Sequence, residues 1–175
     1  MLFEKVSETV GFLKGKTTYR PKVAVILGSG LGDLVDYIEE QVEVDYKDIP
    51  NFPVSTVAGH AGKLVFGKIG GVEVVAMKGR FHFYEGYDMK TVTYPVFVFK
   101  QFGIEKIIVS NAAGGINRTF DPGTLMIITD FINGFGTNPL IGHNDERFGV
   151  RFPDMSEVYK KSLVAEAKNI ADEIG

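Results

Sequence analysis

The sequence contains no cysteine and only three histidines. Without cysteine, a disulfide framework, a thiolate nucleophile and a thiolate metal site are all excluded. The histidines His60, His82 and His143 are scattered, and no group of histidine and aspartate has the spacing of a metal site. We therefore expect no bound metal, and we assign no role to His143.

An excess of basic residues is also absent. The net charge of −3 and the pI of about 5.6 argue against a nucleic-acid partner, because affinity for the phosphate backbone comes from clustered lysines and arginines. Charged residues at Glu4, Lys5 and Glu8 interrupt the apolar start of the chain, and no later apolar run is long enough to span a membrane. We expect a cytoplasmic protein with no membrane partner.

The composition that is present is typical of a folded globular domain. The chain has 175 residues, of which 45% are hydrophobic and 23% are charged. Segments with strand character alternate with segments of helical periodicity, and one pair of strands has the pattern of a hairpin. We expect a single α/β domain over residues 1–175, with a mixed central sheet flanked by helices.

Four segments have apolar residues at helical spacing. They predict an opening helix that ends near Gly15, a helix over 31–39, a helix over 89–102, and a closing helix whose capping box is Asp154 and Glu157. The third of these contains Pro95 and ends at Gly103.

Five short runs rich in β-branched residues predict strands. Residues 63–69 and 72–78 form the expected hairpin, while 22–27, 106–110 and 124–132 read as buried strands. Residues 134–153 are dense in Gly, Pro, Asn and Asp, and loops of such length are usually functional.

GSGLG at residues 28–32 lies between a predicted strand and a predicted helix. Its backbone N–H groups, the helix N-terminus and the Ser29 hydroxyl could hold an anion the size of phosphate. The spacing is neither the dinucleotide fingerprint nor the G-x-S-x-G elbow of hydrolases. A purely structural turn explains the glycines equally well.

GRFHFYEGY at residues 79–87 places Arg80, His82 and Glu85 among aromatic side chains. Arg80 and His82 are two residues apart on an extended segment, so they point to the same face. A guanidinium fork with a histidine that Glu85 could orient favours an oxyanion ligand. The alternative is a surface ion pair beside a hydrogen-bonded core histidine.

NAAGGIN at residues 111–117 follows a predicted strand and begins with small residues. A flat ligand could approach the backbone of Ala112, Ala113 and Gly114, although a tight turn is an equally good explanation. His60, in the GHAG stretch, reads by itself as a loop residue rather than a ligand.

Seven motifs together resemble the trimeric purine nucleoside phosphorylases, in the same order and over nearly the whole chain. They are GSGLG, IPNFP, GHAGKLVFG, GRFHFYEGY, NAAGGIN, NPLIGHNDERFG and RFPDMS. The resemblance implies an α/β phosphorylase fold and a homotrimer that serves purine salvage. It also implies reversible phosphorolysis of purine (deoxy)ribonucleosides to the free base and (deoxy)ribose 1-phosphate, with inorganic phosphate as co-substrate and no cofactor.

The resemblance assigns roles to residues at matching positions. His82 and Glu85 are the expected catalytic pair, in which Glu85 orients His82. The phosphate-binding residues would be Ser29, His60, Arg80, His82 and Ala112. The nucleoside-binding residues would be Tyr84, Ala113, Gly114 and Phe152, and Phe152 would close the ribose pocket of a neighbouring subunit.

The family chain continues beyond the residues that match here. Its later part carries the glutamate and asparagine that recognise the purine and a further phosphate-binding serine. The present chain therefore resembles the N-terminal portion of the family chain. We expect it to be a truncated phosphorylase domain that is inactive by itself. Two alternatives are the related methylthioadenosine phosphorylases and a non-catalytic module that binds phosphate or nucleoside.

Overall fold

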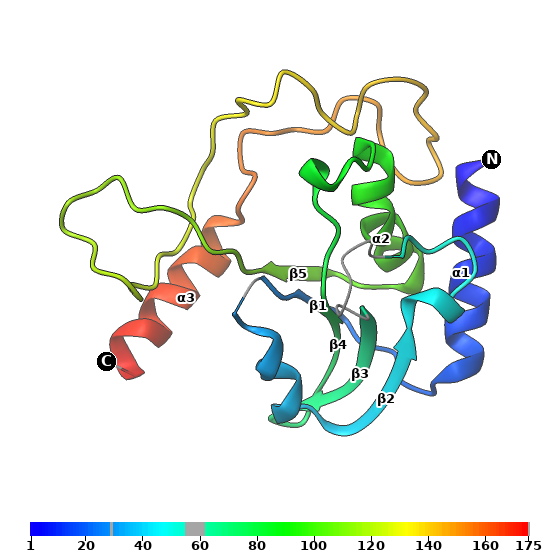
Figure 1. The fold of residues 1–175 in the computed structure, drawn as a ribbon, viewed down its shortest axis with the longest axis horizontal. Coiled ribbons are helices and arrows are strands. Elements are labelled where there is room, and N and C mark those ends of the chain that lie inside the picture. The colour runs from blue at the N-terminus through cyan, green and yellow to red at the C-terminus, as the bar shows by residue number, and fades with distance from the viewer. Residues whose placement is uncertain (29, 55–61, 175) are drawn as a thin grey trace. The chain divides into compact units, whose positions relative to one another are not determined.

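The structure is a computed structural model that describes residues 1–28, 30–54 and 62–174. The chain divides into two compact units, Met1–Ala112 and Ala113–Gly175, and each is described by itself. Figure 1 shows the first unit in blue to green and the second in green to red. None of the helices in these ranges is long and apolar enough to cross a membrane.

A five-stranded mixed sheet forms the centre of the first unit, as the sequence predicts. Its strands lie in the order β2-β3-β4-β1-β5 (Figure 1). β1 pairs in parallel with β4 and β5, while β3 pairs antiparallel with β2 and β4. The bounds are β1 Val23–Ile26, β2 Glu39–Asp45, β3 Lys63–Ile69, β4 Val72–Lys78 and β5 Lys106–Val109.

The predicted hairpin of β3 and β4 is confirmed. Its two-residue turn is Gly70 and Gly71, with φ of 56° and 79°. Both angles lie in the left-handed region, which glycine adopts without the steric cost that a Cβ imposes. The turn fixes the register that pairs Leu64 with Met77 in the buried middle of the sheet.

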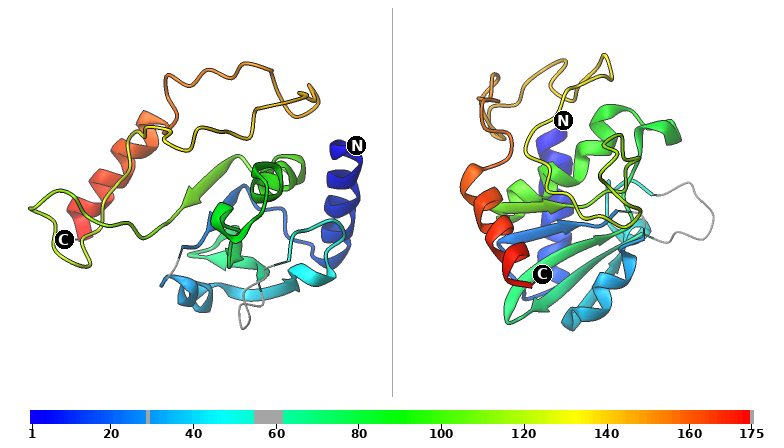
Figure 2. Two further views of the ribbon diagram at one scale, coloured as in Figure 1. Left: turned by 45° about the horizontal axis from the view of Figure 1, so that its top comes forward. Right: turned by 90° about the vertical axis from the view of Figure 1, so that its left-hand side faces the viewer.

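Helices cover one face of the sheet, and a short 3-10 helix covers the other (Figure 1 and Figure 2). The helices α1 Leu2–Lys16 and α2 Met89–Phe102 pack against each other, and the Phe102 ring of α2 lies 5.6 Å from the Phe66 ring of β3. The opposite face packs around Val35 and Ile38. Alternate residues of β1, β3 and β4 therefore serve two apolar layers.

The end signals of α2 match the sequence. The Asp88 carboxylate accepts a hydrogen bond from the Thr91 N–H at 2.7 Å, and Gly103 ends the helix with φ of 111°. Pro95 lies inside the helix, as predicted. By contrast, α1 runs past Gly15 to Lys16 and ends at Thr17, whose backbone is extended.

The helix predicted over 31–39 is wrong in type and extent. The structure has a 3-10 helix, η1, at Gly32–Tyr37, and β2 already begins at Glu39. The sequence did not predict β2, because its acidic residues lower strand propensity. Two pairs of opposite charge hold it to β3, with Lys68 2.8 Å from Glu40 and Lys63 2.6 Å from Glu43.

Two predictions of buried strands are also wrong. β5 forms, but it is exposed, with 58% of Ile108 accessible. It lies at the edge of the sheet, and among the described residues its one partner strand is β1. Residues 124–132 form neither helix nor strand. An apolar β-branched run gives propensity for a strand, but a strand also needs a partner for its backbone groups.

The second unit contains one helix among the residues described, α3 Lys161–Ile174. It begins later than predicted, so the capping box at Asp154 and Glu157 is wrong. The Asp154 carboxylate accepts from the Ser156 N–H at 2.9 Å in a local turn, and Glu157 accepts from the Lys161 N–H at 2.7 Å. Residues 134–153 contain no helix or strand, in agreement with the predicted loop.

We expect Asp88→Ala to destabilise the first unit by about 1 kcal/mol at neutral pH, because the cap of α2 is lost. Hydrogen bonds from the Thr91 side chain and N–H lower the pKa of Asp88. A depressed pKa adds stability above the ordinary pKa of about 4, and this stability is lost as the pH falls through the folded value. Thermal denaturation across pH 2–7, roughly the range that spans both values, should show the difference from wild type shrinking in acid.

Asp88→Asn is the matched control, since its amide oxygen still accepts from Thr91 but does not titrate. A pH dependence that is identical in wild type and Asp88→Asn would contradict the assignment to this carboxylate.

Candidate functional site

The carboxyl ends of β1, β4 and β5 meet at one edge of the sheet, because the three strands run parallel. The residues that follow them are Gly28 after β1, Arg80 after β4 and Ser110 after β5. In open α/β sheets, ligands bind outside such strand ends. Two of the predicted motifs, GSGLG and GRFHFYEGY, therefore begin at the position where this fold class binds ligands.

The Arg80 guanidinium joins two of these segments. Its Nε donates to His82 Nε2 at 3.1 Å, and its Nη1 donates to the Ser110 carbonyl oxygen at 2.8 Å. A guanidinium has no acceptor, so His82 Nε2 must be the acceptor. In this arrangement His82 is neutral, with its proton on Nδ1.

Glu85 accepts the hydrogen bond that His82 Nδ1 donates. His82 Nδ1 lies 2.6 Å from Glu85 Oε1, and the same oxygen accepts from the His82 backbone N–H at 3.1 Å. The Glu85 side chain is only 6% exposed, and its Oε2 has no hydrogen-bond partner among the residues that the structure describes. The carboxylate fixes the ring of His82 from one side, while Arg80 contacts the other.

Tyr84 lies on the outer face of this group. Its ring stacks on the His82 ring, with the centroids 4.8 Å apart and the planes inclined at 20°. It belongs to the 3-10 turn η3 Phe83–Glu85, which ends at Gly86 with φ of 94°. With 82% of its surface exposed, Tyr84 presents a flat apolar face to solvent beside Arg80 and His82.

A buried tyrosine, Tyr46, holds the backbone that precedes Arg80. The Tyr46 hydroxyl donates to the Gly79 carbonyl oxygen at 2.6 Å, immediately before Arg80. Burial raises the pKa of Tyr46 well above its usual range, so the hydroxyl remains a donor. Its ring packs against Phe52 and Phe81 at centroid distances of 4.9 and 5.4 Å. The backbone on both sides of Arg80 is thus held to the hydrophobic core, at Gly79 by the Tyr46 hydrogen bond and at Phe81 by its buried ring.

The described residues of GSGLG, 28 and 30–32, lie at the end of β1. The Leu31 N–H donates to the Gly28 carbonyl oxygen at 3.2 Å, and Gly30 has a φ of 84°. The Gly28 N–H donates to the Ser110 hydroxyl at 2.9 Å. We expected the N-terminus of an α-helix to attract an anion here. That prediction is wrong, because η1 is a 3-10 helix of six residues.

The first unit brings together four of the predicted site residues, Arg80, His82, Tyr84 and Glu85. Ala112 lies two residues beyond Ser110 in the same unit. Ser29 and His60 lie outside the residues that the structure describes. The sequence interpretation missed Ser110, although its place at the end of a predicted strand beside GSGLG could have indicated it.

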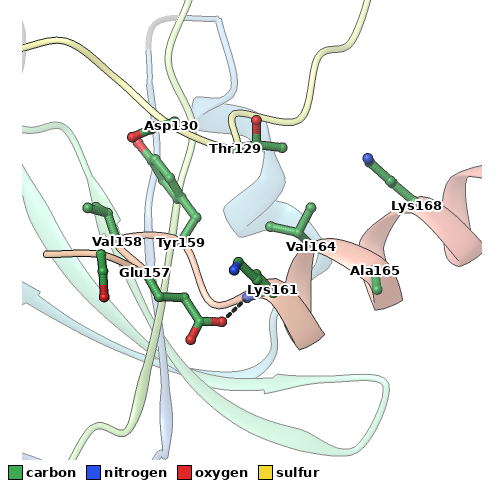
Figure 3. Close-up of a pocket in the computed structure, with 10 residues that line it drawn as sticks. Thr129, Asp130, Glu157, Val158, Tyr159, Lys161, Val164, Ala165 and Lys168 are labelled. Carbon is green, nitrogen blue, oxygen red and sulfur yellow. Dashed lines mark hydrogen bonds between the residues drawn. The ribbon is translucent and has the colours of Figure 1, made fainter.

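The other predicted residues, Ala113, Gly114 and Phe152, belong to the second unit. Phe152 is 86% exposed, and the Arg151 guanidinium lies 5.6 Å from its ring centre. A pocket of about 380 Å³ near the start of α3 includes none of the predicted site residues (Figure 3). In the described ranges, no three His, Asp or Glu side chains are grouped so that they could hold a metal ion.

The sequence model of the phosphorylase superfamily matches residues 22–175. The chain belongs to the phosphorylase superfamily. Purine nucleoside phosphorylase 1 of Geobacillus stearothermophilus is 57% identical over 97% of this chain, and the mouse (Mus musculus) purine nucleoside phosphorylase is 54% identical over 94%. The predicted resemblance to the purine nucleoside phosphorylases is confirmed.

Solved structures of phosphorylases agree with the fold. A purine nucleoside phosphorylase in complex with ribose-1-phosphate has a TM-score of 0.93 and 43% identity over 98% of this chain and 64% of its own. The Schistosoma mansoni enzyme in complex with inosine has a TM-score of 0.91 and 41% identity, covering 98% and 61%. The chain spans 62% of the Geobacillus phosphorylase and 58% of the mouse phosphorylase.

Proposed function

We propose that this protein is a purine nucleoside phosphorylase that converts a purine (deoxy)ribonucleoside and phosphate into the free base and (deoxy)ribose 1-phosphate. The observation that carries the proposal is the group of Arg80, His82 and Glu85 at the parallel strand ends. It occurs in a chain that is 57% identical to a phosphorylase of this name. We also propose that residues 1–175 belong to one nucleoside phosphorylase domain.

In this reaction a phosphate oxygen forms a bond to the anomeric carbon, while the bond from that carbon to the purine nitrogen breaks. The ribosyl group carries positive charge in the transition state, so a positioned phosphate anion stabilises it and then becomes the nucleophile. Arg80 would supply the positioning through the N–H groups of its fork that His82 and Ser110 leave unused. No protein side chain needs to act as a covalent nucleophile.

Both ring nitrogens of His82 have defined hydrogen-bond partners before phosphate binds. Its Nε2 accepts from Arg80, so a phosphate ligand has to replace that hydrogen bond. Glu85 keeps the ring oriented during the exchange through its 2.6 Å contact with Nδ1.

The remaining assignments follow the resemblance. Ser29, His60 and the backbone of Ala112 would complete the phosphate site. Tyr84, which is exposed and stacked on His82, would pack against the ribose. Ala113 and Gly114 would bind the nucleoside. Phe152 would contact a neighbouring subunit of a homotrimer, because a large exposed aromatic side chain commonly marks an interface. We propose cytoplasmic purine salvage with no cofactor.

Calorimetric titration of the 175-residue chain with inorganic phosphate tests the proposal. We expect saturable binding, and we expect ribose 1-phosphate to compete with it, because both would occupy the Arg80 site. A chain that folds but binds neither ligand would refute the function. Hypoxanthine release from inosine and phosphate measures turnover, and the expectation that this chain alone is inactive stays a prediction that this assay decides.

A further inference from the structure

We infer that Ser110 is a positioning residue that holds Gly28, at the end of β1, and Arg80 in register with each other. The inference rests on the proposed function, because the position it sets is that of the phosphate-binding groups. None of the motifs that indicated the site includes Ser110, which is the residue between β5 and NAAGGIN.

The Ser110 side chain ties the end of β5 to the end of β1. Its hydroxyl oxygen accepts from the Gly28 N–H at 2.9 Å and lies 3.4 Å from the Ile26 carbonyl oxygen, to which it can donate. A hydroxyl has one donor and two acceptor sites, so both contacts can exist together. The Gly28 N–H is the first amide of GSGLG, and the hydroxyl is what connects it to β5.

The Ser110 backbone ties β5 to β4. Its carbonyl oxygen accepts from Arg80 Nη1 at 2.8 Å, and its N–H continues the parallel ladder by donating to the Ile26 carbonyl oxygen at 3.0 Å. Ser110, which itself follows β5, therefore contacts the segments that follow β1 and β4. Moving Ser110 would move Gly28 and the Arg80 fork relative to each other.

The close approach at Gly28 indicates that this register is set tightly. A Cβ built on Gly28 would lie 2.5 Å from the Ser110 carbonyl oxygen and 2.9 Å from the Asn111 Cα. The two backbones can lie this close only because residue 28 is glycine. The Ser110 hydroxyl accepts the hydrogen bond of the Gly28 N–H at the point where these two backbones are closest.

A purely structural role for the hydroxyl would predict a different outcome from a positioning role. Ser110→Ala keeps the backbone carbonyl that Arg80 uses and the N–H of the ladder, so the sheet itself is not interrupted. It removes only the acceptor of the Gly28 N–H, which frees Gly28 to shift away from Arg80. The loss should appear in anion affinity rather than in folding alone.

The test is phosphate titration of the 175-residue chain as wild type, Ser110→Ala and Ser110→Thr, with thermal denaturation of each. We expect Ser110→Ala to weaken phosphate binding roughly tenfold, the effect of leaving one amide unpaired. Ser110→Thr keeps the hydroxyl and should restore the affinity. Thr93→Ala is the matched control, because it also loses a hydroxyl that donates within the first unit, to the Met89 carbonyl oxygen at 2.8 Å.

The outcomes separate this inference from the proposed function. If wild type binds phosphate and Ser110→Ala binds it equally well, the positioning role is refuted and the phosphate site stands. A loss in Ser110→Ala that Ser110→Thr does not restore, or that Thr93→Ala matches, would also refute the role of the hydroxyl. If wild type binds no phosphate, the proposed function fails and this inference fails with it.

Discussion

Arg80→Lys is expected to weaken phosphate binding by about 1–3 kcal/mol, the range for a hydrogen bond to a charged group. That loss corresponds to a dissociation constant roughly 5 to 150 times higher. Arg80 already uses Nε on His82 and Nη1 on Ser110, and its planar fork leaves further donors for a ligand. A lysine ammonium is a point charge that cannot keep both contacts and still bind phosphate in two places.

Arg20→Lys is the matched control for this substitution. Arg20 also donates to backbone carbonyl oxygens, those of Thr17 at 3.0 Å and Tyr19 at 2.7 Å, but it is not at the strand ends. Calorimetric titration of both variants with phosphate should show a loss only for Arg80→Lys. An unchanged dissociation constant in Arg80→Lys would remove Arg80 from the phosphate site.

Gly28→Ala is expected to abolish measurable phosphate binding and to destabilise the first unit by about 1–3 kcal/mol, as overpacking of a tight contact does. The added methyl group would lie 2.5 Å from the Ser110 carbonyl oxygen and 2.9 Å from the Asn111 Cα, both of which are backbone atoms. Neither can rotate away as the end of a side chain would. β5 would therefore have to separate from the end of β1. The Ser110 carbonyl oxygen, which accepts a hydrogen bond from Arg80, would then be displaced.

Gly11→Ala is the control for Gly28→Ala, and its expected effect has the opposite sign. Gly11 lies in the middle of α1, and nothing is within 4 Å of a Cβ built there. Alanine should stabilise this helix by about 0.5–1 kcal/mol and leave phosphate binding unchanged. Thermal denaturation and phosphate titration measure both effects. A Gly28→Ala chain as stable as wild type would show that the two backbones are not in close contact.

The elements with strong local signals could be predicted from the sequence. α1 and α2 have long apolar stripes, and α2 also has its own N-cap and a terminating glycine. The hairpin of β3 and β4 was predictable from two apolar runs joined by Gly70 and Gly71. In these cases the residues that fix the backbone are neighbours in sequence, so no knowledge of the rest of the fold is needed.

Elements that depend on distant partners could not be predicted in this way. β2 is acidic, and it is held by lysines of β3 that lie 20 and 28 residues away. Residues 124–132 have the composition of a strand, yet they pair with no strand in the part of the chain that the structure describes. The prediction that β5 is buried was wrong for the same reason. Its place at the edge of the sheet is determined by the topology and not by its four residues.

The candidate site also has features that could be predicted from the sequence and features that could not. Arg80, His82 and Glu85 were predictable as a group, because they lie within six residues of each other on one segment. The hydrogen bond from Arg80 to His82 Nε2 was not, since the sequence suggested that both side chains face a ligand rather than each other. Ser110 was missed because it meets Gly28 and Arg80 only when three parallel strands are assembled.

The hydrogen bond from Tyr46 to the Gly79 carbonyl oxygen has a consequence for how the sequence can change over evolutionary time. Tyr46 packs on Phe52 and Phe81, so a substitution in that aromatic cluster shifts the backbone that carries Arg80. Such a change can leave the domain folded and still alter the proposed site. Selection on ligand affinity therefore restricts drift at core positions that touch no ligand.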